Sequence, residues 1–363
     1  MKNTIGNNVS LTLFGESHGE AIGAVLDGIA PGIKVVEEFI DYQLSLRRPS
    51  GQISTAREEK DNYKILSGVF NGYTTGTPIC IVIPNEDTKT KDYSEIMNKA
   101  RPGHADFTAF SKYHGYEDYR GGGHFSGRIT AGMVAAGAIA ISALKNRGIF
   151  IGTHILKCGG IEDDAFIDYN SQITALNSKD FAVINDKTAE KMQSEILKAK
   201  QNGDSVGGVL ETAVTGIPAG VGEPWFDTVE GMLSHALFSI PAVKGVEFGM
   251  GFSIADMLGS TANDIFYFEN SAVKTKTNNN GGINGGITNG MPILFRCAIK
   301  PTPTIAKSQE TVDFVNKTDT EIAAKGRHDP CIVHRARVVV DSITAIVLCD
   351  MLQGRFGTDW LVK

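Results

Sequence analysis

The stretch that decides the fold is residues 130–146, TAGMVAAGAIAISALKN. It consists largely of small and apolar residues, and its one charged residue is Lys145, near the end. A helix that is apolar on every side has to be buried, because no face of it suits water. We therefore expect this segment to be a buried helix of a layered protein.

On both sides of this segment, runs typical of strands and of helices alternate irregularly. Runs rich in Val, Ile, Leu and Phe predict strands near 9–14, 22–27, 65–70, 79–83, 206–214, 246–254 and 291–299. Further helices are predicted at about 37–46, 187–201, 228–238 and 341–353. No linker of Pro, Ser or like charge divides the chain, so we expect one domain over residues 1–363 with an α+β layered fold and long functional loops.

Composition limits the class of protein. The chain has 363 residues, 42% of them hydrophobic, and a formal charge of −6, which argues against a general nucleic-acid binder. We find no run of about 18 apolar residues and no apolar core of a signal peptide, so no membrane span is expected. Five cysteines without a C-x-x-C pair fit a reduced, cytoplasmic setting.

Two blocks present a histidine from a turn that contains glycine. FGESHG (14–19) follows a predicted strand, and its two glycines indicate a tight turn that presents His18. RPGHAD (101–106) fixes the backbone beside His104, whose imidazole can act as a general acid near neutral pH. In each block a purely structural histidine, or a solvated turn, is the alternative.

Three further blocks concentrate arginines. Arg47 and Arg48 end a predicted helix, where they either complement its dipole or bind a carboxylate or phosphate. DYRGGGHFSGR (118–128) places three glycines before the apolar helix and predicts an anion cradle that is not a P-loop. Asp329 lies among cations in GRHDPC (326–331), either as a base or in a structural salt-bridge cluster. An acidic protein with such loops is expected to bind a small polyanion.

Taken together, these blocks resemble the chorismate synthase family. The matching motifs follow the family's order from residue 14 to residue 331: FGESHG, RRP, RPGHAD, DYRGGG, SIPAVKGVE (239–247), GGINGGI (281–287), KPTPT (300–304) and GRHDPC. The resemblance implies a β-α-β sandwich, a homotetramer and a lyase of the shikimate pathway, which leads to the aromatic amino acids. It implies a 1,4-anti elimination of phosphate from 5-enolpyruvylshikimate 3-phosphate to give chorismate. Reduced FMN would be the catalytic electron donor, without net redox change, and would come from an external reductant.

The same resemblance assigns residues. His18 and His104 would be catalytic, one assisting the phosphate and the other the flavin, and Asp329 would lie near flavin N5. Substrate anions would be bound by Arg47 and Arg48, a pair also linked to NADP in that family, with Arg120, Arg128 and Arg335 as further candidates. The implied FMN contacts are His124, Phe125, Ser126, Pro241, Ala242, Gly285, Lys300, Pro301, Thr302, Pro303, Thr304 and Arg327.

Two positions depart from the family's pattern. Many relatives have Arg-Ser-Ser after the glycines, whereas Phe125 here lacks a hydroxyl, so a flavin contact would use backbone or stacking. Ile53 stands where a basic residue often follows RRP. The main alternative function is a metal-dependent phosphatase or lyase with His18, His104, His328 and Asp329 as ligands, although short-range spacing such as H-E-x-x-H is missing. The second alternative function is a flavin-binding module without catalytic activity.

Overall fold

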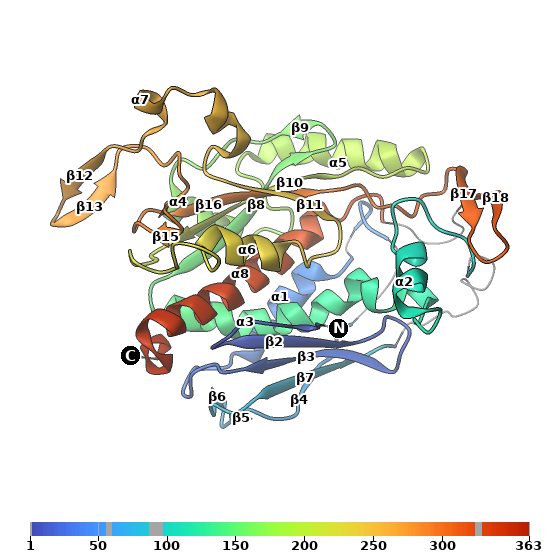
Figure 1. Cartoon of the computed structure of the whole chain (residues 1–363), viewed down its shortest axis with the longest axis horizontal. Coiled ribbons are helices and arrows are strands. Elements are labelled where there is room, and N and C mark those ends of the chain that lie inside the picture. Colours follow the sequence, from blue (N-terminus) through green and yellow to red (C-terminus); the bar gives the residue numbers. More distant parts are fainter. Residues whose placement is uncertain (1, 50, 56–59, 87–96, 324–328, 363) are drawn as a thin grey trace.

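Two antiparallel β-sheets enclose a layer of helices in the computed structural model (Figure 1), which describes residues 2–49, 51–55, 60–86, 97–323 and 329–362. The first sheet contains, in spatial order, β1 (Thr4–Ile5), β2 (Ser10–Gly15), β3 (Ala21–Asp27), β7 (Ile79–Pro84) and β4 (Lys64–Ile65). The second contains β11 (Val243–Phe248), β16 (Ile293–Ile299), β10 (Gly208–Thr215), β8 (Phe150–Cys158) and β9 (Ile161–Glu162).

The layer between the sheets consists of α1 (Glu37–Arg47), α3 (Thr130–Asn146), α6 (Val229–Leu237) and α8 (Val333–Phe356) (Figure 1). The helix α3 packs against β3 of the first sheet and against α8, which in turn packs against β8 of the second sheet. One apolar core therefore continues from sheet to sheet through the helices. The expected layered β-α-β sandwich is confirmed.

Two glycines explain how α3 fits into this layer. A Cβ on Gly132 would lie 2.8 Å from the backbone of Gly23 in β3, and a Cβ on Gly137 would lie 2.2 Å from Cβ of Ser342 in α8. Both approaches require the absence of a side chain. The segment Gly127–Asn146 is long and apolar enough to cross a membrane, contrary to our expectation that no run would qualify, but 89% of the apolar window is buried inside the protein.

The structure differs from the predicted elements in several places, and the strand predicted near 65–70 is two short strands, β4 and β5 (Val69–Phe70). We did not predict β8, because Thr153 and His154 interrupt its apolar pattern, yet both side chains are buried. The helix α8 begins at Val333, eight residues before our expected start, because its charged first turns hid the helical period. The strand predicted at 246–254 ends at Phe248. The helices α2 (Asp106–Tyr113) and α4 (Tyr169–Leu176) were not predicted; α4 packs on β8 and β10.

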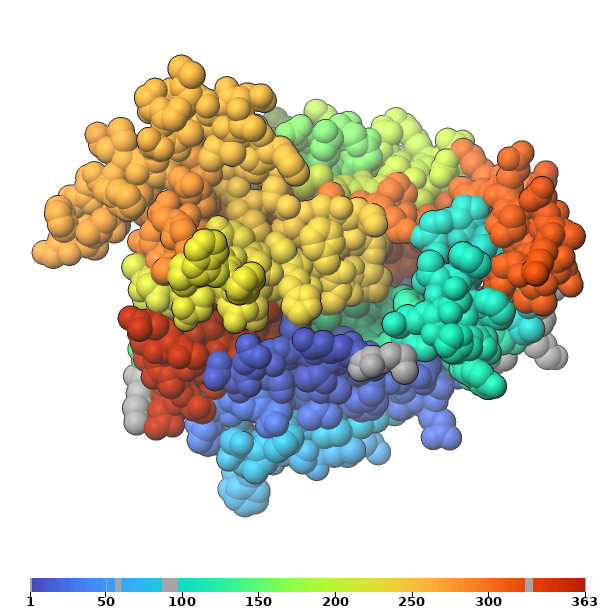
Figure 2. All heavy atoms as spheres, in the orientation of Figure 1, coloured from blue at the N-terminus to red at the C-terminus, as the bar shows by residue number. Residues whose placement is uncertain are grey.

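The remaining elements lie outside the sandwich. They are α5 (Asp186–Gln201), α7 (Gly259–Ala262) and the hairpins β5–β6 (Val69–Phe70, Tyr73–Thr74), β12–β13 (Phe266–Glu269, Ala272–Thr275), β14–β15 (Ile283–Asn284, Ile287–Thr288) and β17–β18 (Gln309–Asp313, Thr318–Ile322). The segment 250–275, which we call the arm, projects away from the body at the upper left of Figure 2. Large apolar side chains are exposed along it.

Candidate active site

The glycine turn, residues 121–123, lies between the two predicted catalytic histidines. Its three residues have φ values of 58°, 83° and 52°, a conformation that residues with side chains rarely adopt. A Cβ on Gly121 would lie 2.2 Å from Cε1 of His18, and a Cβ on Gly122 would lie 3.2 Å from Cε1 of His104. The glycines thus allow two histidines from distant parts of the chain to meet the same turn.

Ser17 fastens the His18 loop to this turn. Its backbone N–H donates to the carbonyl of Gly123 at 3.2 Å, and its hydroxyl lies 3.0 Å from Nδ1 of His18 and 3.1 Å from the carbonyl of Gly121. On the other side of the turn, Nδ1–H of His124 donates to the carbonyl of Gly15 at 2.8 Å. The end of β2 and the glycine turn are therefore one unit, and the imidazole of His18 is buried in it. His124, an expected FMN contact, has a structural hydrogen bond here.

His104 comes from a tight turn that its own sequence prescribes. In Arg101-Pro102-Gly103-His104, proline occupies the second position and Gly103 the third with a φ of 73°, and the N–H of His104 donates to the carbonyl of Arg101 at 3.0 Å. This is the pattern of a type II turn. Asp106, at the start of α2, contacts both Arg101 and His104.

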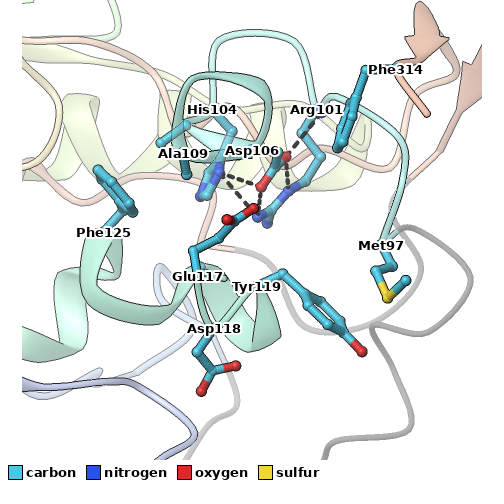
Figure 3. A pocket seen from close by; sticks show the side chains of 12 residues that line it. Met97, Arg101, His104, Asp106, Ala109, Glu117, Asp118, Tyr119, Phe125 and Phe314 are labelled. Atoms are coloured by element: carbon cyan, nitrogen blue, oxygen red, sulfur yellow. Dashed lines mark hydrogen bonds and ion pairs between the residues drawn. The ribbon is translucent and has the colours of Figure 1, made fainter. Parts of the chain in front are cut away.

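A pocket opens in front of His104 (Figure 3). Its wall combines the charged groups of Arg101, Asp106 and Glu117 with apolar and aromatic side chains. Phe125, the residue that departs from the family's pattern, is one of these and packs edge-on against Tyr113 with ring centroids 6.1 Å apart. Oε2 of Glu117 is buried without a hydrogen-bond partner in the described part of the chain.

The expected FMN segment 300–304 adjoins this pocket from the second sheet. Nζ of Lys300 donates to the carbonyl of Gly103, and NH1 of Arg101 donates to Oγ1 of Thr304 at 3.4 Å. The backbone N–H of Lys300 donates to the carbonyl of Ala242 at 2.9 Å, which joins it to the 241–242 segment. Ala242 has a φ of 76°, and such strain in a residue with a side chain concentrates at functional sites.

Two of the predicted substrate arginines converge on one carboxylate. Asp61, whose side chain is fully buried, accepts from NH2 of Arg47 at 2.9 Å and from NH1 of Arg128. Burial alone would raise the pKa of Asp61, but the two guanidinium groups outweigh it and hold the pKa below its usual value. Sequence reasoning missed Asp61, because the run EEKD in which it lies is typical of solvated charge.

Asp329 lies in the same network. Its carboxylate accepts from the backbone N–H of Thr55 at 3.0 Å and from NH1 of Arg335 at 2.8 Å. Nε of Arg335 also donates to the carbonyl of Arg47 at 2.7 Å, so the predicted base is joined to the Asp61 cluster. Arg48 lies at the end of α1, where its NH1 donates to the carbonyl of Lys60 at 2.9 Å.

Asn85 connects the arginine cluster to the histidine site. Its side-chain oxygen accepts from Nε of Arg128 at 3.1 Å, and its side-chain NH₂ donates to the carbonyls of Glu16 and Gly19, each at 2.9 Å. Those two carbonyls flank His18 in the sequence. The structure therefore gathers His18, Asp329 and the arginines into one continuous polar network that the sequence order does not reveal.

Other predicted residues lie apart from this network or at its edge. Gly285 is at the tip of the β14–β15 hairpin, beyond the start of β16, whereas Lys300 follows the end of β16. At about 3.3 Å per residue, the strand separates these two positions by roughly 20 Å. Ile53 packs against the apolar core. Arg120 lies at the edge of the site, where its carbonyl accepts from the Ser17 hydroxyl at 3.1 Å and its guanidinium forms an ion pair with Asp118 at 2.8 Å. Arg327 and His328 lie outside the described residues.

The ligands of the alternative metal site are not assembled in the described part of the chain. Within residues 2–49, 51–55, 60–86, 97–323 and 329–362, no three His, Cys, Asp or Glu side chains are close enough together to hold a metal ion. His18 and His104 contact neighbouring glycines, but Asp329 is held by Thr55 and Arg335.

Comparisons with known proteins agree with the motifs and the fold. The family model described as chorismate synthase matches residues 9–353. The chorismate synthase of Pyrococcus abyssi is 48% identical over 361 residues, 99% of each chain, and that of Methanobrevibacter smithii is 45% identical over 355 residues, 96% of each chain. A crystal structure of a chorismate synthase superposes with a TM-score of 0.77 at 30% identity and covers 98% of this chain and 94% of its own. The chain therefore belongs to the chorismate synthase family of carbon–oxygen lyases.

Proposed function

We propose that this enzyme forms chorismate from 5-enolpyruvylshikimate 3-phosphate by 1,4-anti elimination, with reduced FMN as its cofactor. The observation that carries the proposal is the convergence of His18 and His104 on the glycine turn, beside a buried network of arginines. Elimination breaks the C–O bond to phosphate and a C–H bond of the ring, so the site has to stabilise a leaving anion and to handle a proton. The arginines can stabilise the leaving anion, and the histidines can exchange the proton.

The charge of the site suits this substrate. Two carboxylates and a phosphate require several cations in a protein whose formal charge is −6. Arg47, Arg128 and Asp61 together carry one net positive charge in a buried place. Planar guanidinium groups that are already oriented bind carboxylate and phosphate oxygens with little loss of side-chain entropy. The predicted substrate role of Arg47, Arg48, Arg128 and Arg335 rests on this argument.

The residues around segment 300–304 fit a flavin. Oγ1 of Thr302 is buried without a hydrogen-bond partner in the described part of the chain, although a buried hydroxyl usually has one. The neighbouring backbone is strained at Ala242 and has no side chains at the glycine turn, where Gly122 lines the pocket. His124 to Ser126, Pro241, Ala242 and Lys300 to Thr304 would hold the cofactor, with Gly285 and Arg327 as further predicted contacts. Reduced FMN would supply an electron as phosphate leaves and would recover it with the ring hydrogen.

The two histidines would manage protons from opposite sides of the glycine turn. The imidazole of His104 faces the pocket, so its Nε2 can give a proton to, or take one from, a bound group there. Nδ1 of His18 contacts the Ser17 hydroxyl, which orients the ring. Asp329, held by Arg335 and a backbone N–H, would be the acidic group near flavin N5.

The proposal also includes the oligomeric state of the enzyme and its location in the cell. We take residues 1–363 as one catalytic domain of a cytoplasmic homotetramer that receives reduced flavin from a separate reductant. Support for self-association comes from the arm, where the side chains of Phe252 and Phe268 are 86% and 79% exposed. Apolar groups concentrated on a projecting segment usually mark a protein–protein contact.

The decisive experiment is an anaerobic assay of the purified enzyme with reduced FMN and 5-enolpyruvylshikimate 3-phosphate. The product diene and the released phosphate are followed together. Equal appearance of both, dependent on reduced flavin, is the expected result. Release of phosphate without diene, or turnover that ignores flavin and needs a metal, would refute the proposal in favour of a hydrolase.

A further inference from the structure

The carboxylate of Asp106 is completely engaged by two neighbours. Its Oδ2 accepts from the backbone N–H of Arg101 at 3.0 Å and from Nε at 2.8 Å. Its Oδ1 accepts from NH2 of Arg101 at 2.7 Å and lies 2.9 Å from Nδ1 of His104. A carboxylate has about four acceptor positions, and all four are directed at these two residues (Figure 3).

This arrangement determines which nitrogen of His104 carries a proton. Burial would raise the pKa of Asp106, but hydrogen bonds and charge from Arg101 and His104 outweigh burial and hold the pKa well below its usual range. An ionised carboxylate only accepts, so Nδ1 of His104 has to be the donor. NH2 of Arg101, 3.0 Å from the same Nδ1, then cannot donate to it and is satisfied by Asp106 instead.

The opposite edge of the His104 ring faces the glycine turn and the pocket. A Cβ on Gly122 would lie 3.3 Å from Nε2, so the ring approaches the backbone as closely as a glycine permits. No hydrogen bond to Nε2 is present among the described residues, and the side chain is 18% exposed. With the proton held on Nδ1, a neutral imidazole presents the lone pair of Nε2 to the pocket, and an imidazolium presents an N–H there.

We propose that Asp106 is a positioning residue, which fixes the orientation and the Nδ1–H tautomer of His104 so that Nε2 exchanges protons in the pocket. The inference rests on the proposed function, because it assigns His104 a part in the elimination. Asp106 itself acts through His104 and not on the substrate. A purely structural clamp between Arg101 and the start of α2 is the competing interpretation, and the following tests separate the two.

The kinetic test is a double-mutant cycle. D106N should lower kcat by about 10²-fold, the usual effect of a small misplacement of a reacting group, and should change KM much less. D106E, which keeps the charge, should recover part of the rate. Added to H104Q, D106N should cost almost nothing further, because its effect passes through His104. If D106N lowers the rate of H104Q by the same factor as that of the wild type, the proposal is wrong.

The matched control is D168N. Asp168 also stands at a helix N-terminus and accepts from Ser171, but it is exposed and outside the site. Its variant should keep the wild-type rate. Melting temperatures show whether each variant folds, and if D106N does not, D106E takes its place in the cycle.

A spectroscopic test does not depend on turnover. Magic-angle-spinning NMR of protein with ¹⁵N-labelled histidine separates protonated from unprotonated ring nitrogens, and the His104 signals are those missing in H104Q. The wild type should show a protonated Nδ1 and an unprotonated Nε2 at high pH, and D106N should show a mixture. An unchanged tautomer in D106N would overturn the positioning role. If the wild-type enzyme forms no chorismate, the proposed function fails while this result still stands.

Discussion

Replacing Asp61 by Asn tests the energetics of the arginine cluster. The side chain of Asp61 is 0% exposed, and those of Arg47 and Arg128 are 4% and 5% exposed. Asp61 has a φ of 53°, which Asn adopts as readily as Asp, so the substitution removes a charge without new backbone strain. Breaking a buried ion pair by removing one partner costs about 3–5 kcal/mol, because the remaining charges stay buried.

We expect D61N to lose stability near the lower end of this range, about 3 kcal/mol, because Asn keeps one acceptor oxygen. For a chain of this size, about 1.3 °C of melting temperature corresponds to 1 kcal/mol, so Tm should fall by about 4 °C. The pKa of Asp61 is lower in the folded state than in the unfolded state. Its contribution to stability is therefore fully present above its pKa in the unfolded state and is lost as the pH falls through its pKa in the folded state. The difference in Tm should therefore be constant from about pH 5 upward.

The assay is thermal unfolding at fixed protein concentration, with and without inorganic phosphate at constant ionic strength. D61N removes the negative charge that Arg47 and Arg128 share, so phosphate, which supplies negative charge, should raise Tm more in the variant than in the wild type. D186N is the control, because the carboxylate of Asp186 is 86% exposed and its ion pair with Lys179 should be worth less than about 1 kcal/mol. A D61N protein as stable as the wild type, with no extra response to phosphate, would refute this reasoning.

Three further predictions follow from close contacts and buried charge. G121A should fold, but its turnover rate should fall at least about 10²-fold, because its Cβ would displace His18. G127A is the control and should be nearly unaffected, because the space around that position is open. Equal rates in the two variants would contradict the role of the turn. G137A should be destabilised by about 1–3 kcal/mol, and S342G should restore much of the loss in the double variant; a wild-type Tm in G137A would show that α3 and α8 can separate without cost. Burial would lower the pKa of His154, but Asp163 and Glu211 outweigh it and raise the pKa. The stabilisation by the imidazolium is therefore present below about pH 6.5 and is lost as the pH rises through the higher pKa of His154 in the folded state. The Tm difference between wild type and H154Q should shrink from pH 6 to pH 9. A constant difference would count against a stabilising imidazolium.

The sequence by itself was sufficient for the buried central helix, the layered class and the family. Residues 130–146 are apolar on every side, and this property depends only on the local order of residues. The turn from Arg101 to His104 could likewise be predicted from the sequence, because Pro and Gly each favour particular backbone angles. Motifs in a fixed order identify a family for the same reason, since each is a short local pattern.

The tertiary structure decided which of these groups meet. The sequence analysis did not single out Asp61, and only the folded chain makes it the shared partner of Arg47 and Arg128. Gly285 and Lys300 are both predicted flavin contacts, and only the fold shows that the length of β16 lies between them. The strand β8 escaped prediction because both of its faces are covered, so its polar residues are buried without any alternation. Local patterns fix local conformation, whereas the partner of a charge depends on contacts between segments far apart in the chain, and only the folded molecule brings those together.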